Sequence, residues 1–377
     1  MKILKLFKSK FIFKNPSNKD VLILDYDTCY FNELFLKNKA TILKIRGEEY
    51  YLKILIISFF DWIKSQNMTL GQLYIINCIR YIKPKFIITF YDYNTFFLSL
   101  KKIFPEKKLI FFQSHQRSFI TLKDILDKKN KKKIKKYFVD YIFLWGDYYK
   151  KYYSFFCNAK YFTTGSVKNN SFSNKKTITK KHISFISQFR MHNRKPGFLV
   201  DTNENKKKII LRALSKYCKN KKITIYIIAQ QSKYDGVQSE KNYYSKLFKE
   251  SKVKYLSRNN PLSSYKNTKK LNNFITFSSS LGLELISRGK KVAFIKIQKD
   301  RYPKSKYKQY LFNLKSDSKN CLTSIEKRKL FRFFNFLTTK NNLVFRKIYN
   351  KDFKKYIIYD QKNRITKNNL RKIGLKI

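Results

Sequence analysis

Short apolar runs alternate with longer amphipathic stretches along most of the chain. In the first half, six mainly apolar runs predict buried strands at 21–24, 41–45, 86–90, 108–112, 141–145 and 159–163. Stretches between them, such as Leu70–Ile82 and Thr95–Ile103, space their apolar residues as a helix does. Continuous apolar strands separated by helices are typical of a parallel sheet that is covered on both faces.

The second half repeats this alternation after a polar segment without periodicity at 171–181. Apolar runs predict strands at 183–186, 223–229, 274–277 and 291–295, and amphipathic runs predict helices at 206–219, 240–250, 262–271 and 281–288. We therefore expect an α/β protein with two doubly wound, Rossmann-like domains that face a cleft. The expected ranges are 1–175 for the first domain, 176–320 for the second and 321–377 for a helical tail.

Composition narrows the class of protein. The chain has 377 residues, and its 43% of apolar residues excludes wholesale disorder. Its net charge is +60, and the lysine excess runs evenly along the chain, which indicates a compositional bias rather than a selected patch. A field this positive favours anionic partners such as nucleotides, phospholipid surfaces and acidic glycans. A lysine-rich nucleic-acid-binding protein is the alternative from another class.

The cysteines, the histidines and the apolar runs argue against a disulfide-bonded, a zinc-binding, a membrane-spanning or a secreted protein. Five cysteines, an odd number without a C-x-x-C pair, predict free buried thiols in a reducing compartment. The three histidines share no metal-ligand spacing. No run reaches the roughly 18 apolar residues of a membrane span, and the apolar run at the N-terminus is too short for a signal peptide. We expect a cytoplasmic protein.

The sharpest candidate for a binding site is Ser278-Ser279-Ser280, which follows an expected strand and opens the next helix. A helix N-terminus offers free N–H groups and a partial positive charge, so this turn suits a phosphate. Glu284 lies about one turn later and can accept hydrogen bonds from ribose hydroxyls. The alternative is an ordinary serine N-cap that Glu284 supports, as in a capping box. Gly282, retained in a chain with only nine glycines, favours the ligand.

Six segments resemble motifs of one known family and occur in the same order over residues 20–295. They are Lys83–Asn94, Phe112–Arg117, Gly165–Asn170, Ile186–Arg190, Ser263–Tyr265 and Ser278–Gly289. The chain thus resembles the bacterial surface carbohydrate biosynthesis proteins, which are GT-B glycosyltransferases related in architecture to CDP-glycerol glycerophosphotransferases. The resemblance implies a GT-B fold, with the acceptor on the first domain and the nucleotide-sugar on the second.

The resemblance also implies a role for single residues on the donor side. Phosphate would be held near Ser278, Ser279, Ser280 and Gly282, and the ribose by Glu284. Many GT-B enzymes carry Arg or Lys where this chain has Gln230-Gln231. The leaving phosphate would therefore be stabilised by Lys233 or Arg190 instead.

On the acceptor side, polar residues follow the expected strand ends. They are Asn94, Gln113 and His115, with Asp92 and Glu48 as candidate catalytic carboxylates. Asp92 is our first choice for the base that takes the proton of the acceptor hydroxyl, and its alternative role is a helix N-cap. Gln113-Ser114-His115 replaces the family's Q-N-G, so we expect a rebuilt loop there.

We therefore predict a glycosyltransferase of the GT-B type that extends a surface polysaccharide or a lipid-linked glycan from a nucleotide-sugar. No cofactor and no metal are expected, since the D-x-D of Asp25–Asp27 comes too early in the chain for the metal motif of GT-A enzymes. A CDP-glycerol-like polyol-phosphate transferase or a CMP-sugar transferase of the same fold stays open. The basic aromatic helix at 323–337 would either lie on an anionic membrane or pack across the domains.

Overall fold

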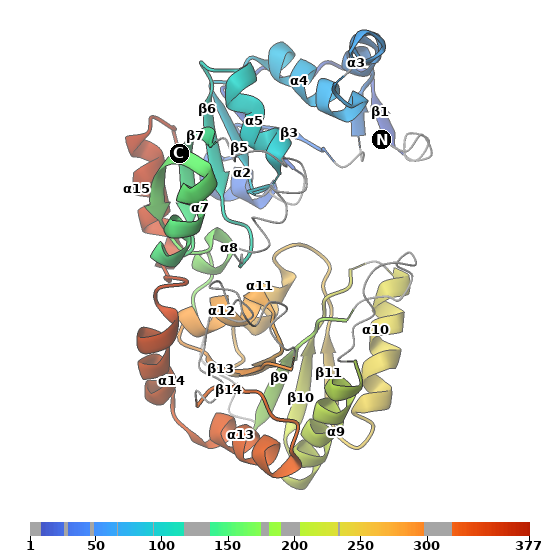
Figure 1. Ribbon diagram of the computed structural model, residues 1–377. Coiled ribbons are helices and arrows are strands. Elements are labelled where there is room, and N and C mark those ends of the chain that lie inside the picture. The colour runs from blue at the N-terminus through green and yellow to red at the C-terminus, as the bar shows by residue number, and fades with distance from the viewer. Residues whose placement is uncertain are drawn as a thin grey trace.

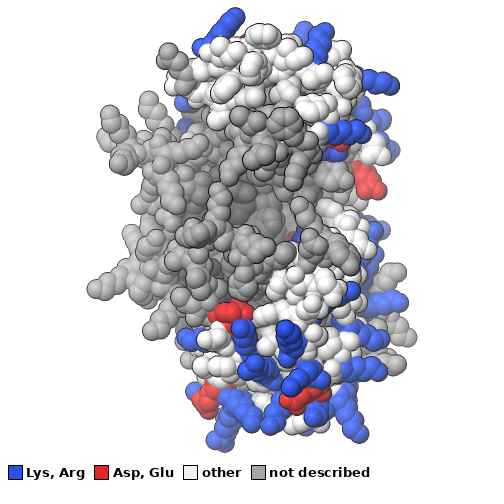
Figure 2. Space-filling model, turned by 90° about the vertical axis from the view of Figure 1, so that its right-hand side faces the viewer, with Lys and Arg blue, Asp and Glu red and all other residues white. Residues whose placement is uncertain are grey.

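Within the described residues, each half of the chain forms one six-stranded parallel sheet, and the two sheets lie in separate domains (Figure 1). The computed structural model describes residues 9–25, 29–45, 49–65, 67–92, 94–116, 136–174, 181–189, 204–232, 234–297 and 319–377. Lys and Arg side chains are spread over both domains (Figure 2). That distribution agrees with the even lysine bias of the sequence.

The first sheet has the strand order β3-β2-β5-β6-β7-β8. Its strands are β2 (Val21–Leu24), β3 (Thr41–Leu43), β5 (Phe86–Thr89), β6 (Lys108–Phe112), β7 (Tyr137–Leu144) and β8 (Cys157–Thr163). The helices α2 (Cys29–Leu36), α4 (Leu70–Ile82), α5 (Thr95–Ile103) and α7 (Lys150–Phe156) belong to this domain. Successive residues of β5 enter different apolar clusters, Ile87 in one and Ile88 in the other, because side chains alternate across a strand. Both faces of the sheet are therefore covered, as predicted.

The second sheet has the order β11-β10-β9-β12-β13-β14, which is that of the doubly wound dinucleotide-binding fold. Its strands are β9 (His182–Ile186), β10 (Thr224–Ile228), β11 (Val253–Leu256), β12 (Asn273–Thr276), β13 (Lys291–Ile295) and β14 (Cys321–Leu322). Its helices include α9 (Glu204–Asn220), α10 (Tyr234–Leu247), α11 (Ser263–Thr268) and α12 (Ser280–Ser287). The strand order reverses between β9 and β12, so the loops after these two strands border the expected ligand position.

All ten strands expected from apolar runs are present, with shifts of a few residues at their ends. The strands that were not predicted are β1 (Lys10–Ile12), β4 (Glu49–Tyr51), β11 and β14. β11 and β14 are edge strands, and β1 pairs only with β4 in the described part of the chain. Short strands of this kind depend on a neighbour far along the chain, so the local pattern does not reveal them.

The C-terminal segment serves both domains. The range 321–377, expected as a helical tail, begins with β14 of the second sheet and continues into α13 (Lys327–Thr339), α14 (Asn342–Ile348) and α15 (Arg364–Lys372). Phe334 of α13 is fully buried in the second domain's core, whereas Leu370 of α15 is buried in the first domain's core. The chain therefore crosses back to the domain in which it began.

Two glycines let the returning segment lie against the first domain. Ile358 N–H donates to the carbonyl of Trp145 at 2.9 Å. A Cβ on Gly146 would lie 2.4 Å from the carbonyl oxygen of Lys355, and one on Gly165 would lie 2.3 Å from that of Ile358. Gly165 also has a φ of +75°, which favours glycine. These contacts explain why both glycines are retained in a glycine-poor chain.

Gly165→Ala should lower the free energy of unfolding by about 2 kcal/mol or more, because it adds backbone strain to a backbone clash. The matched control is Gly71→Ala, whose Cβ meets nothing within 4 Å in α4 and should stabilise the protein by roughly 0.5–1 kcal/mol. Urea unfolding followed by circular dichroism measures both. Equal effects of the two substitutions would contradict the contact.

Candidate functional site

The loops at the carboxyl ends of the two sheets touch each other. Gln116, which follows β6, donates its N–H to the hydroxyl of Ser280 at 3.3 Å, and Ser280 is the first residue of α12. In doubly wound sheets, ligands bind outside the carboxyl ends of the strands. This contact therefore brings the expected acceptor side and donor side to one place.

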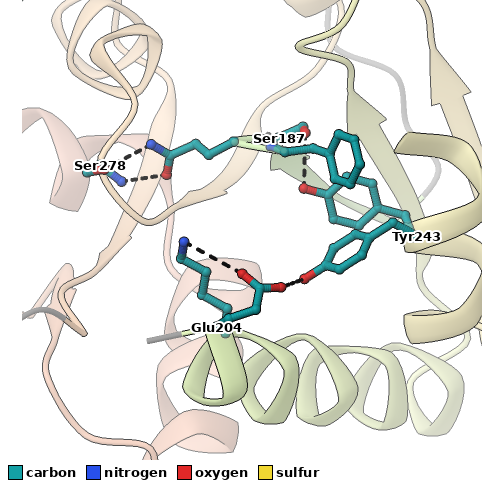
Figure 3. Close-up of polar contacts among 8 residues, drawn as sticks. Ser187, Glu204, Tyr243 and Ser278 are labelled. Carbon is teal, nitrogen blue, oxygen red and sulfur yellow. Dashed lines mark hydrogen bonds and ion pairs between the residues drawn. The ribbon is translucent and has the colours of Figure 1, made fainter. Parts of the chain in front are cut away.

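On the donor side, Gln188 joins the loops that follow β9 and β12 through two hydrogen bonds to Ser278, which is labelled in Figure 3. Its amide nitrogen donates to the hydroxyl of Ser278, and its amide oxygen accepts the N–H of Ser278, both at 2.9 Å. The N–H of Ser278, one of the donors expected for phosphate, is therefore used by Gln188. The bond pair holds the switch point of the second sheet together.

Ser279 is the N-cap of α12, and Gly282 is a packing residue. The hydroxyl of Ser279 accepts the N–H of Leu281 at 3.3 Å, as in the capping alternative. A Cβ on Gly282 would lie 2.7 Å from a methyl carbon of Thr276 and 3.0 Å from the ring of Phe294. Gly282 therefore lets α12 approach β12 and β13, so packing alone accounts for this glycine, and its place beside a donor phosphate stays a prediction.

Glu284 lies buried at the junction of the domains, with 2% of its surface exposed. Its carboxylate accepts the hydroxyl of Tyr265 at 2.8 and 2.9 Å and the hydroxyl of Ser166. Ser166 is the N-cap of α8 (Val167–Asn170) in the first domain. Ribose contact with Glu284 would require one of these two hydroxyls to move, so its proposed role at the ribose stays a prediction. Capping-box support of α12 is excluded, because Glu284 points to Ser166.

Burial raises the pKa of Glu284 from 4.5 to about 6, and the hydroxyls of Ser166 and Tyr265 oppose this rise. The charge of Lys168 and that of Arg288, itself buried, also oppose it. Desolvation is the largest cause because the carboxylate is shielded from water and forms no ion pair among the described residues.

On the acceptor side, Asp92, Ser114 and His115 form a chain of hydrogen bonds. The hydroxyl of Ser114 donates to Asp92 at 3.3 Å, and Nδ1 of His115 lies 2.8 Å from the same hydroxyl. Asp92, which is 1% exposed, also accepts the hydroxyl of Tyr153. His115 is exposed, so it is the member of this chain that a substrate can reach.

Gln113 and Asn94, two residues predicted for the acceptor side, bind backbone groups after β6 and β5. The side chain of Gln113 donates to the carbonyl of His115 and accepts the N–H of Trp145, both at 2.9 Å. Asn94 caps α5 by accepting the N–H of Phe96, which is the alternative role predicted for Asp92. The departure from Q-N-G needs no strained backbone, because neither Ser114 nor His115 has a positive φ.

Three predicted site residues lie outside the described residues: Glu48, Arg190 and Lys233. Of the D-x-D, only Asp25 is described. Within the described ranges, no three His, Cys, Asp or Glu side chains come together as a metal site would require. No described helix is long and apolar enough to cross a membrane.

Sequence reasoning missed Glu240, which organises the loop after β10. Glu240 is fully buried and accepts the N–H groups of Gln230 and Gln231 at 3.1 and 2.9 Å. It also accepts the hydroxyls of Ser187 and Tyr255. The signal in the sequence was the unusual pair Gln230-Gln231. Glu240 binds the backbone N–H groups of this pair and not its amide side chains.

The basic aromatic helix is packed in the protein. Phe333 and Phe334 of α13 are buried, and Phe331 and Phe336 contact the rings of Tyr217 and Phe345. The apolar side chains of α13 are therefore packed within the second domain rather than across both domains. Contact of this helix with a membrane stays a prediction.

A protein-family model described as "putative O-antigen biosynthesis protein" matches residues 110–373, which is more than half of the chain. The chain belongs to this family. The match confirms the prediction of a surface carbohydrate biosynthesis protein. A search of curated protein sequences finds no match to the chain.

Solved structures share the fold along nearly the whole chain. MnaA of S. aureus, in a structure with UDP, is 11% identical, with a TM-score of 0.54 over 95% of this chain and 97% of that one. The UDP-GlcNAc 2-epimerase of Neisseria meningitidis, bound to UDP-GlcNAc, is 12% identical, with a TM-score of 0.52 over 93% and 99%. The UDP-GlcNAc 2-epimerase of Methanocaldococcus jannaschii is 12% identical, with a TM-score of 0.51 over 94% and 98%. The family member described here therefore has the expected GT-B fold.

The raised pKa of Glu284 makes stability depend on pH. The folded state binds the proton more tightly than the unfolded state, so this stabilisation is complete below pH 4.5 and is lost as pH rises through 6. The free energy of unfolding of Glu284→Gln, measured relative to that of wild type, should therefore be about 2 kcal/mol higher at pH 7.5 than at pH 4.5. Urea unfolding at both pH values measures this difference, and a difference that does not change with pH would contradict the buried carboxylate.

Proposed function

We propose that this O-antigen biosynthesis protein is a glycosyltransferase that moves a sugar from a nucleotide-sugar to a growing surface polysaccharide or a lipid-linked glycan. The observation that carries the proposal is the contact between Gln116 and Ser280. It joins the loop of the reachable His115 to the N-terminus of α12 in the other domain. Membership of an O-antigen family supports a glycan product.

His115 is the base in this proposal, in place of Asp92. Ser114 has one hydroxyl proton, which it donates to Asp92. Its oxygen therefore accepts from Nδ1 of His115, which carries a proton, so Nε2 is the basic nitrogen of the neutral imidazole. Asp92 thereby acts as a positioning residue that sets the tautomer of His115 through Ser114.

Transfer follows from this arrangement. Nε2 of His115 takes the proton of the acceptor hydroxyl as that oxygen forms its bond to the anomeric carbon of the sugar. The bond from this carbon to the nucleotide phosphate breaks, and the phosphate keeps the electron pair. The positive end of α12 at Ser279 and Ser280 stabilises the departing negative charge. Asp92 stabilises the imidazolium that forms.

The same proposal includes a reaction without metal and a location in the cytoplasm. Because two of the neighbours were solved with UDP or UDP-GlcNAc, a uridine nucleotide is the first donor to test. The two alternatives of the same fold, with a CDP-linked or a CMP-linked donor, differ in the nucleotide that binds.

A thermal-shift screen of UDP-, GDP-, CMP-, CDP- and TDP-linked compounds should find a stabilising uridine donor. A donor at 100 times its Kd adds about 2.7 kcal/mol of stability. Binding should persist at high salt and with EDTA, whereas nucleic-acid binding by many lysines falls steeply with salt. Conversion of UDP-GlcNAc to its C2 epimer without any acceptor would replace the proposal with an epimerase.

His115→Ala should lower kcat by roughly 10²- to 10⁴-fold, because the general base is lost, while the Kd of the donor stays unchanged. Ser114→Ala should cost about 5- to 10-fold, the effect of one hydrogen bond that orients the base. Ser99→Ala is the matched control, since its hydroxyl donates to the carbonyl of Phe96 within α5. Single-turnover transfer measures all three, and full activity of His115→Ala would exclude this base.

A further inference from the structure

One helix of the first domain carries an unusual number of exposed apolar side chains. Helix α3 (Leu52–Lys64) lies next to α4 and precedes it in the chain. Six of its side chains are large, apolar and exposed: Ile56 49%, Ile57 45%, Phe59 45%, Phe60 58%, Trp62 44% and Ile63 63%. Contiguous exposed apolar surface on a folded protein is typical of an interaction site.

Four of these residues share one face of the helix. Ile56, Phe59, Phe60 and Ile63 follow the i, i+3, i+4, i+7 spacing, and we call them the apolar tip. The other face of α3 is anchored, because Ile54 and Leu55 are buried in the same apolar cluster as Tyr74 and Ile75 of α4. A second apolar face of this kind is not needed to hold the helix in the domain, so it is available to a partner.

A further exposed apolar side chain follows the strand that pairs with β4, next to α3. β4 leads directly into α3 and pairs with β1, which is followed by Phe13, 80% exposed. Figure 1 places β1 and α3 together at the end of the first domain that lies away from the second domain. The apolar tip is therefore remote from the loop of His115 and belongs to a different surface.

The charges around the apolar tip are positive. Lys53 and Lys64 of α3 are exposed, and so are Lys10 and Lys14 beside β1. The only acid of α3, Asp61, accepts a hydrogen bond from Asn77 of α4 at 2.7 Å. An apolar helix face with exposed cations and a tryptophan at its side fits the interface of an anionic bilayer.

We propose that the apolar tip binds the surface of an anionic membrane, with α3 lying in the interface plane. The helix is 13 residues long, too short to span a bilayer, which needs about 20. A second copy of the chain is a poorer partner, because each copy carries +60 and like charges repel. The proposal does not rest on the reaction above, since binding to vesicles is measured without any donor.

The test is co-sedimentation of the full chain with vesicles of phosphatidylcholine and phosphatidylglycerol. The combined substitution Phe59→Ser, Phe60→Ser and Ile63→Ser should weaken binding by at least about 100-fold, because three exposed apolar side chains no longer enter the bilayer. It leaves the charge of +60 unchanged. Unchanged binding would mean that lysines alone attract the vesicles, and would overturn the proposal. The matched control is Leu343→Ser, a 64% exposed residue on α14 of the second domain, which should bind as wild type does.

Tryptophan fluorescence gives a second readout. The protein has two tryptophans, of which Trp62 is 44% exposed and Trp145 is 2% exposed. Anionic vesicles should shift the emission to the blue, and Trp62→Phe should abolish the shift while binding persists. Vesicles of phosphatidylcholine alone should bind more weakly. If wild type is instead a dimer that the triple substitution dissociates, the apolar tip is an interface between copies and the membrane proposal fails.

Discussion

A buried carboxylate at the domain junction is the interaction on which the candidate site depends. Glu284 reaches from α12 to Ser166 in the first domain and to Tyr265 in its own domain. A buried carboxylate is costly unless donors surround it, and here hydroxyls provide them. Because Glu284 and Ser280 lie on the same helix, this contact between the domains also helps to fix how α12 meets the loop after β6.

Several polar side chains near the site form hydrogen bonds within the loops that surround it. Gln188 joins two strand ends, Glu240 gathers the loop after β10, and Gln113 fixes the carbonyl of His115. Such groups immobilise loops at the edge of a rigid sheet, which is where catalytic groups need to be held. His115 is exposed, so in the proposed reaction it can meet a substrate. The apolar tip of α3 lies on another surface, so the proposed chemistry and the proposed membrane contact would use separate parts of the first domain (Figure 1).

The sequence predicted the strands well and the site unevenly. Strands such as β2 and β5 are buried on both faces, so burial leaves an unbroken apolar run that the sequence displays. Ser279 and Ser280 were found because a strand followed by hydroxyls marks a helix start. The sequence alone could not assign Gly282, since a close approach looks the same in sequence whether it is to a ligand or to Phe294. Ser166 and Tyr153 were missed because their carboxylate partners lie 118 and 61 residues away along the chain. Glu240 was missed although two of its partners are near in sequence, because another, Ser187, lies 53 residues away.

The sequence by itself determined the two doubly wound domains and the carbohydrate family, because apolar periodicity and ordered motifs are local along the chain. Only the tertiary structure decided what each polar residue does. Asp92 and His115 are linked through the hydroxyl of Ser114. The carboxylate of Asp92 is nevertheless buried away from solvent, whereas the imidazole of His115 is exposed. Burial is a property of the packed whole: it depends on side chains such as Tyr153 that arrive from distant segments, and no local pattern records it.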